Sequence, residues 1–396
     1  MKILVINSGS SSVKYQIIEM PGEHILCKGM AERIGSPEAV LHHKTTRGSE
    51  QKMEVLPDHK TAIEKITALL THPDTGVLQN VEEIEAVGHR VVHGGSAFEE
   101  ATLINEIVKQ KIREFFPLAP LHNPHNLEGI EQSQQFFPAA SQVAVFDTAF
   151  HNTIPLLSRK YAIPETLFKE HGIQMYGFHG ISHKYVTEKA VAFLEKGSSG
   201  KLISVHLGNG CSMTAVKDGK SIDHSLGFST STGLIMGSRS GDIDHAIVFY
   251  LVNSLGYTLD EVNTLLTRKS GMLGLTGFND LRDIEKAATN GDRACLLALE
   301  MNAYRIKKYI GAYTAAMNGL NAVIFTAGIG ENSSLLRSMI CQNMDYLGME
   351  IDSVKNKSKE EGICDISAAN SKVRILVIPT NEELEIAKQV HTFLQF

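Results

Sequence analysis

Two segments of the chain follow one plan, and this pair constrains the fold more than any other feature of the sequence. The segments at 3–17 and 202–220 each contain an apolar run, a turn rich in glycine, serine or asparagine, and a second run ending in a turn. A short apolar run bounded by turn residues is typical of a buried strand. The pattern predicts two strand–turn–strand units and, if the repeat is real, two related halves. Chance similarity is the alternative on pattern alone.

Strand and helix signals alternate along the rest of the chain, which is the mark of an α/β protein. Further buried strands are expected at 143–146, 322–325 and 375–378, and helices at 183–195, 243–254, 259–267, 292–318 and 381–395. A chain of 396 residues is too long for one compact core and predicts two domains. No low-complexity linker divides them, so we infer the junction near 150 from the repeat.

Composition excludes several classes of protein. The formal net charge of −6 argues against a nucleic-acid partner, which usually needs a basic face. No window approaches the roughly 18 apolar residues of a membrane span, and the apolar run after Lys2 is too short for a signal peptide. The five cysteines are scattered without a CxxC pair, which favours reduced, buried thiols. We therefore expect a cytoplasmic protein with no membrane partner, large enough to be an enzyme.

Three small-residue turns are candidate phosphate-binding loops, although no standard motif is present. A Walker A motif fails before Gly219-Lys220-Ser221, and the dinucleotide pattern lacks its third glycine. The candidates are the serine turn at 8–12, the glycine pair at 206–210, and the segment 326–334, where a helix is predicted to begin near Glu331. Each alone reads as an ordinary hairpin or strand–helix turn. Three such turns directly after buried strands favour a bound polyanion.

Nine sequence blocks resemble those of the acetokinase family, the acetate kinases. The segments NSGSSSVKYQ (7–16) and GFHGISHKYV (177–186) are similar to its two signatures. The other blocks occur in family order and cover nearly the whole chain: 88–95, 117–130, 146–151, 206–212, 233–244, 325–333 and 379–384. The resemblance implies an α/β fold of two ribonuclease-H-like, actin-like ATPase domains with a nucleotide cleft between them. It places one domain at 1–150 plus 383–396 and the nucleotide-binding domain at 151–382, in a homodimer.

The resemblance also implies an activity. It predicts reversible, Mg²⁺-dependent, direct in-line transfer of the γ-phosphoryl group of ATP to acetate, which yields acetyl phosphate and ADP, with Mn²⁺ as an alternative ion. A kinase for propionate or another short-chain carboxylate is the alternative enzyme. A non-catalytic nucleotide switch, such as an actin-like filament subunit or a chaperone ATPase, is the alternative of a different class.

Four catalytic residues follow from the matched blocks. Arg90 is placed on the substrate carboxylate and Arg239 on the transferring phosphoryl group, where guanidinium forks bind oxygen pairs. Without the resemblance, each arginine would read as a surface or ion-pair residue. His179 matches a histidine assigned to transition-state stabilisation. Its H-x3-H spacing with His183 also occurs in zinc sites, but no third ligand accompanies the pair, so we do not read it as a zinc site.

Asp147 matches the family's acidic catalytic residue. A carboxylate substrate with a pKa of about 4 to 5 is already ionised at neutral pH, so it needs no general base. We therefore expect Asp147 to orient an arginine or a metal-bound water. Asn7 and Glu382 match the magnesium-associated positions, and hard oxygen ligands suit that ion. Glu382 reads alternatively as an ordinary acid in the first turn of a helix.

The remaining matched residues divide into an acyl pocket and an ATP site. The resemblance implicates Val92, Leu121 and Phe178 as pocket walls, whereas Thr230 stands where the family usually has proline. Val92 in place of alanine favours acetate as the substrate. Thr230 in place of proline leaves propionate as a possible second substrate. The residues implied for ATP are Lys14, His206, Leu207, Gly208, Asn209, Gly210, Asp280, Leu281, Arg282, Gly328, Ile329, Gly330, Glu331 and Asn332.

Overall fold

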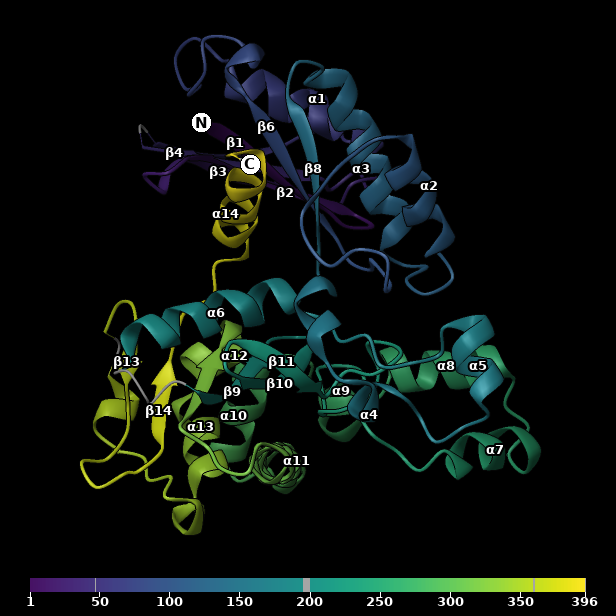
Figure 1. Ribbon diagram of the computed structural model, residues 1–396, viewed down its shortest axis with the longest axis vertical. Helices are drawn as coiled ribbons and strands as arrows, with labels where there is room; N and C mark the ends of the chain where they lie inside the picture. The colour runs from purple at the N-terminus through teal and green to yellow at the C-terminus, as the bar shows by residue number, and fades with distance from the viewer. Residues whose placement is uncertain (47, 195–199, 359, 396) are drawn as a thin grey trace. The chain divides into compact units, whose positions relative to one another are not determined.

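The computed structural model describes residues 1–46, 48–194, 200–358 and 360–395, which divide into two compact units (Figure 1). Unit 1 comprises Met1–Phe150 and Asn381–Phe396, and unit 2 comprises His151–Thr380. The second segment of unit 1 begins two residues before the predicted return at 383. Residue 195, the last of the helix predicted at 183–195, lies outside the described residues, as does 396.

Unit 1 is built on an eight-stranded mixed sheet in the order β5-β4-β3-β2-β1-β6-β8-β7. Its strands are β1 (Lys2–Ser8), β2 (Ser12–Glu19), β3 (His24–Glu32), β4 (Val40–Thr45), β5 (Gly48–Met53), β6 (Ala86–Val91), β7 (Thr102–Leu103) and β8 (Ser141–Phe146). Its helices are α1 (His59–Leu70), α2 (Glu106–Glu114), α3 (Asn123–Phe136), α14 (Glu382–Gln395) and the 3₁₀ turn η1 (Val81–Glu83). The turn η2 (Ala149–Thr153) spans the boundary with unit 2.

Unit 2 is built on a six-stranded mixed sheet in the order β11-β10-β9-β12-β14-β13. Its strands are β9 (Lys201–Leu207), β10 (Cys211–Lys217), β11 (Lys220–His224), β12 (Ala322–Thr326), β13 (Cys364–Asp365) and β14 (Arg374–Val377). Its helices are α4 (Leu156–Arg159), α5 (Glu165–His171), α6 (Gly180–Phe193), α7 (Ala246–Asn253), α8 (Leu259–Arg268), α9 (Gly271–Thr276), α10 (Leu281–Thr289), α11 (Arg293–Met317), α12 (Ala327–Asn332) and α13 (Ser334–Cys341), with turns η3 (Asp345–Leu347) and η4 (Lys355–Lys357).

The two sheets share one central order, which confirms the α/β fold class and the repeat. In each sheet three antiparallel strands, β3-β2-β1 or β11-β10-β9, continue into two strands parallel to the first, β6-β8 or β12-β14. This is the ribonuclease-H-like order that the resemblance implies. The serine turn joins β1 to β2, and the turn at 208–210 joins β9 to β10. Both candidate phosphate loops therefore occupy the equivalent hairpin of their unit.

Side-chain alternation along β1 divides the sheet of unit 1 between two layers of helices (Figure 1). Leu4 and Ile6 belong to the core that includes residues of α1. The opposite face carries Val5 and Gly88, where α14 packs so closely that a Cβ on Gly88 would lie 2.8 Å from Ile386. Because Asn7 lies two residues beyond Val5, it shares the face covered by α14.

Asn123 is the first residue of α3 and follows the N-cap His122. Its side chain pairs with the backbone of His93, accepting from N and donating to O at 3.0 and 2.9 Å. The five cysteines are free, and four of them are buried. Among the described residues, no helix combines the length and apolar character needed to cross a membrane.

Candidate active site

A guanidinium and two carboxylates meet on the α14 face of unit 1. Arg90 lies near the end of β6, Asp147 directly follows β8, and Glu382 begins α14. Because β6 and β8 are parallel, their carboxyl ends lie at the same edge of the sheet, and alternation points both side chains to one face. Arg90 Nη2 donates to Asp147 Oδ2 at 2.8 Å, and Arg90 Nε lies 3.8 Å from Glu382 Oε2. We call these three residues the Arg90 cluster.

In the Arg90 cluster Asp147 is buried, whereas Arg90 and Glu382 are partly exposed. Among the described residues, Arg90 Nε is enclosed by protein and has no hydrogen-bond partner. Burial disfavours the charged guanidinium, but Asp147 and Glu382 more than offset this and raise the pKa of Arg90. Burial also raises the pKa of Glu382 to about 7, with Arg90 opposing and Asp147 reinforcing the shift. The cluster therefore holds a fixed cation whose Nε faces Glu382, while the Arg90 side chain as a whole remains 15% exposed to a ligand.

Asn7 in β1 and Lys14 in β2 lie beside α14, the helix that contributes Glu382 to the Arg90 cluster. They are directly opposite each other in the β1–β2 hairpin, and Lys14 Nζ makes an ion pair with Glu383 Oε1 at 2.5 Å. The Lys14 side chain is half exposed, so its ammonium can leave this pair for a phosphate. The amide of Asn7 and the carboxylate of Glu382 are oxygen donors of the kind that a hard divalent cation prefers. This donor set fits the predicted metal role.

The residues predicted for the acyl pocket belong to different units. Val92 is buried in unit 1, where its N–H donates to Asn126 Oδ1 at 3.0 Å, whereas Leu121 of the same unit is 56% exposed. Phe178 is buried in unit 2, and its N–H donates to His224 Nε2 at 3.1 Å. Thr230, also in unit 2, uses its backbone oxygen to accept from Arg239 Nη1 at 2.6 Å. Its position therefore bears on the orientation of the arginine.

In unit 2, two histidines stack at the amino end of α6. His179 is the N-cap of α6 in the left-handed region, with φ of 55°, and its Nδ1 lies 2.9 Å from Ser212 Oγ. Its ring stacks on that of His206, with centroids 4.4 Å apart and planes 16° apart. His206 Nδ1 in turn lies 2.9 Å from Ser182 Oγ. Serine hydroxyls therefore hold both rings at a defined angle.

Two more histidines, His183 and His224, lie next to this pair. His183 has its two ring nitrogens 2.8 Å from Ser204 Oγ and 2.7 Å from Ser212 Oγ, which is hydrogen bonding rather than metal geometry. His224 Nε2 accepts the Phe178 N–H, so in the neutral ring its proton is on Nδ1. Burial lowers the pKa of His183 and of His224 well below the usual value, reinforced by neighbouring histidines. This layer is therefore neutral at physiological pH.

The buried neutral histidines predict acid sensitivity. Burial lowers the pKa of His89 and of His93 to about 4, whereas an unfolded histidine titrates near 6.5. Their contribution to stability is thus present above pH 6.5 and is lost as the pH falls towards 4. We expect each to reduce the free energy of unfolding by about 2 kcal/mol between pH 7 and pH 5. Urea unfolding at the two pH values measures this loss. His89→Asn should flatten the pH dependence, and the exposed His245→Asn should not; equal slopes would contradict the prediction.

In unit 2 the guanidinium of Arg239 reaches the turn at Gly210. A Cβ at Gly210 would lie 2.7 Å from Arg239 Nη2 and 3.4 Å from His179 Nε2. The glycine therefore allows both side chains to reach the turn after β9. Burial lowers the pKa of Arg239 from its ordinary value, yet arginine stays charged at any physiological pH. The turn, the guanidinium and the imidazole together present donors to one small volume.

Predicted ATP residues from three segments line one small cavity of unit 2. Gly208, Asn209, Leu281 and Ile329 all border this cavity, whose volume is about 20 Å³. Its remaining wall is largely apolar: Cys211, Ile235, Met236, Gly237, Met272, Asn279 and Asn302. A cavity of this volume has room for about one water, so it marks where the three segments meet rather than a preformed pocket for a base.

Asp280 and Arg282 lie at the start of α10. Asp280 accepts the Arg282 N–H at 2.9 Å as the N-cap of α10, and their side chains form an ion pair at 2.5 Å. The hydrogen bonds from Arg282 lower the pKa of Asp280 to about 2. Since the Arg282 side chain is 90% exposed, this guanidinium is accessible to a nucleotide.

The third candidate loop differs from its predicted form. The helix expected to begin near Glu331 begins at Ala327, so Gly328, Gly330 and Asn332 all lie within α12. The chain turns from β12 into α12 through Ala327, at φ of 63°. Glu331 accepts the Thr380 N–H at 3.1 Å, and burial raises its pKa. The prediction of a helix boundary was wrong because glycines that suggest a loop can also be helical.

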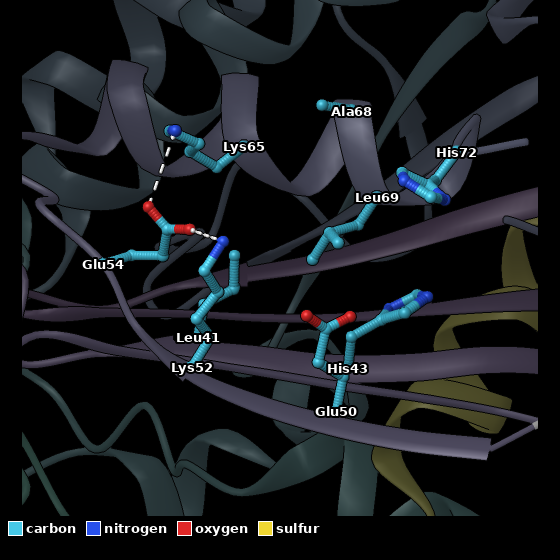
Figure 2. A pocket seen from close by; sticks show the side chains of 9 residues that line it. All are labelled: Leu41, His43, Glu50, Lys52, Glu54, Lys65, Ala68, Leu69 and His72. Carbon is cyan, nitrogen blue, oxygen red and sulfur yellow. Dashed lines mark ion pairs between the residues drawn. The ribbon is translucent and has the colours of Figure 1, made fainter. Parts of the chain in front are cut away.

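Unit 1 contains a larger cavity that none of the predicted site residues lines (Figure 2). It has a volume of about 170 Å³ and lies between the β4–β5 hairpin and α1. Glu54 makes ion pairs with Lys52 at 3.0 Å and with Lys65 at 3.5 Å across it. With Glu50, which also lines the cavity, the two glutamates balance the two lysines, so the cavity is not set up to bind a polyanion.

Several supporting residues were not predicted from the sequence. Ser204 and Ser212 hold the histidines, His151 donates from Nε2 to Phe178 O at 3.0 Å, and Glu383 pairs with Lys14. The serines do carry a signal, because each is a polar residue flanked on both sides by apolar, buried residues of β9 or β10. For Glu383 there is no such signal, since acids are common in the first turn of a helix.

Comparisons with known proteins place the chain in a family. The profile described as "Acetokinase family" matches residues 2–388. A protein of Flavobacterium johnsoniae named acetate kinase is 57% identical over 395 residues, covering 100% of both chains. The chain belongs to the acetokinase family. The predicted enzyme class, a phosphotransferase with a carboxyl acceptor, is thereby confirmed, and membership implies ATP as substrate together with a divalent metal.

Solved structures agree with this assignment. The acetate kinase of Porphyromonas gingivalis superposes with a TM-score of 0.93 at 42% identity and covers 99% of each chain. A propionate kinase of Francisella tularensis superposes with a TM-score of 0.92 at 43% identity and covers 98% of each chain. Acetokinase-family members named for different short carboxylates thus share this fold, so the fold by itself does not select the acyl group.

Proposed function

We propose that this protein transfers the γ-phosphoryl group of ATP to acetate, reversibly and by direct in-line transfer, with Mg²⁺ as its metal. The observation that carries the proposal is the Arg90 cluster. Asp147 fixes the orientation of the Arg90 guanidinium at 2.8 Å, and the arginine side chain remains 15% exposed. Such a fork matches the paired oxygens of a carboxylate. The relatives named acetate kinase support the choice of acetate.

In this proposal Asp147 is a positioning residue. Its carboxylate holds Arg90 Nη2 and is itself only 1% exposed, so it is not placed to exchange protons with solvent. Acetate, with a pKa of about 4 to 5, is already a nucleophile at neutral pH. Phosphoryl transfer depends mainly on alignment and on charge around the transferred group. An oriented Arg90 supplies the alignment of the acceptor oxygens.

Unit 2 supplies the groups for the nucleotide and the transferring phosphoryl. Arg239 donates towards the equatorial oxygens of the transferring phosphoryl group, and the imidazole of His179, held by Ser212, lies beside it. The turn His206–Gly210 and α12 bind the nucleotide, with Asp280 and Arg282 near its base. Asn7 and Glu382 would hold Mg²⁺, which when bound neutralises charge on the phosphate oxygens. Lys14 exchanges its pairing with Glu383 for a phosphate.

We further propose a cytoplasmic homodimer. Exposed large apolar side chains gather on α7 and at the start of α8, including Phe249, Tyr250 and Leu259. An exposed apolar patch of this kind is typical of a protein–protein interface. Sedimentation at low concentration tests the dimer, and a monomeric protein would contradict it.

The experiment that tests the function is a hydroxamate assay for acyl phosphate. With ATP, Mg²⁺ and acetate, we expect acyl hydroxamate to form, and kcat/KM to be higher for acetate than for propionate because Val92 narrows the pocket. One methylene in an apolar pocket changes specificity by about 10- to 200-fold. ATP hydrolysis without hydroxamate would favour the nucleotide-switch class. The reverse order of the two acids would favour the propionate kinase, which the Francisella relative keeps open.

A further inference from the structure

Two histidines and a glutamate meet in unit 1, outside the Arg90 cluster. His59 is the first residue of α1, and His125 and Glu128 lie three residues apart on α3. One ligand atom from each lies within 4.8 Å of the others. Glu128 Oε2 is 3.6 Å from His59 Nδ1 and also 3.6 Å from His125 Nδ1. These contacts are longer than hydrogen bonds, so the three groups surround a point rather than pair directly.

The buried member of this group is already oriented as a metal ligand. His59 Nε2 lies 2.7 Å from the carbonyl oxygen of Gly9, and because a carbonyl can only accept, Nε2 carries the proton. In the neutral ring, Nδ1 therefore turns its lone pair towards Glu128. The His59 side chain is only 6% exposed, so the surrounding protein holds the ring in this orientation. Ligating histidines typically donate their second N–H to a carbonyl in this way.

We propose that His59, His125 and Glu128 bind one divalent transition-metal ion of the Zn²⁺ type. Two imidazole nitrogens and one carboxylate oxygen form a ligand set that favours Zn²⁺ over Mg²⁺. With bonds of about 2.0–2.2 Å, tetrahedral ligand atoms are roughly 3.3–3.5 Å apart. The two contacts of 3.6 Å thus need to shorten by only a few tenths of an ångström. His125 and Glu128 are partly exposed, which provides a path for the ion and room for a water as fourth ligand.

The bound ion would also act on the serine turn. Gly9, whose carbonyl holds His59, closes that turn through its N–H to Ser12 O at 2.8 Å. On α3, the residue after Glu128 is Gly129, where a Cβ would lie 2.7 Å from Ser8 Cβ. The ion therefore stabilises both contacts of the serine turn, the hydrogen bond from His59 to Gly9 and the packing of Gly129 against Ser8. Any resulting change in turnover rests on the proposed function, whereas binding of the ion does not.

Calorimetric titration of the purified full chain with Zn²⁺, without nucleotide or acetate, tests the site. We expect one ion per chain with a Kd in the micromolar range or below. His125→Ala and Glu128→Gln, both at partly exposed positions, should weaken binding at least tenfold. His42→Ala is the matched control, because His42 pairs with Glu32 at 3.3 Å without a third ligand, and it should leave the affinity unchanged. Equal affinity in all four proteins, or no binding by the wild type, would overturn the proposal.

A second measurement does not depend on catalysis. Zn²⁺ should raise the Tm of the wild type and of His42→Ala but not that of the two site variants, and millimolar Mg²⁺ should not abolish the rise. Abolition by Mg²⁺ would mean that the ion sits on oxygen ligands elsewhere. Since neither measurement uses a substrate, a failure of the proposed kinase activity leaves their outcome unaffected.

Discussion

Replacing Arg239 with alanine is expected to lower kcat about 10³-fold or more while leaving ADP affinity nearly unchanged. Its guanidinium is anchored by Thr230 O at 2.6 Å and reaches the Gly210 turn, where transferring phosphoryl oxygens would gather charge. An arginine that stabilises this charge contributes roughly 10³–10⁵ in turnover. ADP lacks the transferred group, so its binding should not depend on this side chain. Steady-state kinetics and calorimetry with ADP measure the two quantities.

One further variant separates the charge of Arg239 from its geometry, and a variant at another position is the control. Arg239→Lys keeps a cation but loses the planar fork and the anchor to Thr230, so we expect most of the loss to remain. Arg268→Ala removes an exposed arginine of α8 in the same unit and should leave kcat unchanged. A kcat for Arg239→Ala within tenfold of the wild type would contradict the proposed role. Loss of the folded circular-dichroism spectrum would instead indicate a structural role.

Replacing Arg90 with alanine is expected to reduce both activity and stability. The variant removes the carboxylate-binding fork, so kcat/KM for acetate should fall about 10³-fold or more. It also leaves Asp147, only 1% exposed, without its 2.8 Å partner. Removing one member of a buried ion pair costs about 3–5 kcal/mol in the free energy of unfolding. Kinetics and urea unfolding at pH 7 measure the two effects.

The double variant Arg90→Ala/Asp147→Asn separates these effects. Because it removes the carboxylate charge that Arg90 balanced, it should regain most of the lost stability and none of the activity. Asp147→Asn alone keeps an acceptor for Arg90, so kcat/KM should fall without any change in the pH profile. A shifted profile would assign Asp147 a proton-transfer role. Recovery of activity in the double variant would remove Arg90 from substrate binding.

Much of the fold could be predicted from local patterns. The apolar runs at 143–146, 202–207 and 322–325 lie within β8, β9 and β12, because a buried strand needs an unbroken apolar segment. The internal repeat proved to be shared sheet topology. The helix expected near Glu331 was misplaced, since Gly328 and Gly330 look like loop residues but lie in α12. Local composition could not show that the turn into this helix occurs at Ala327.

The sequence by itself determined the family, the strand–turn–strand units and the residue types of the site. These three features depend on short-range sequence patterns and on the nine family-like sequence blocks, which occur in family order along the chain. Only the tertiary structure decided the partners: Asp147 on Arg90, Ser212 on His179, and Glu383 on Lys14. Each pair joins residues far apart in the chain. Such contacts arise where parallel strands end at one edge of a sheet, or where a returning helix covers its face, and no local pattern encodes them.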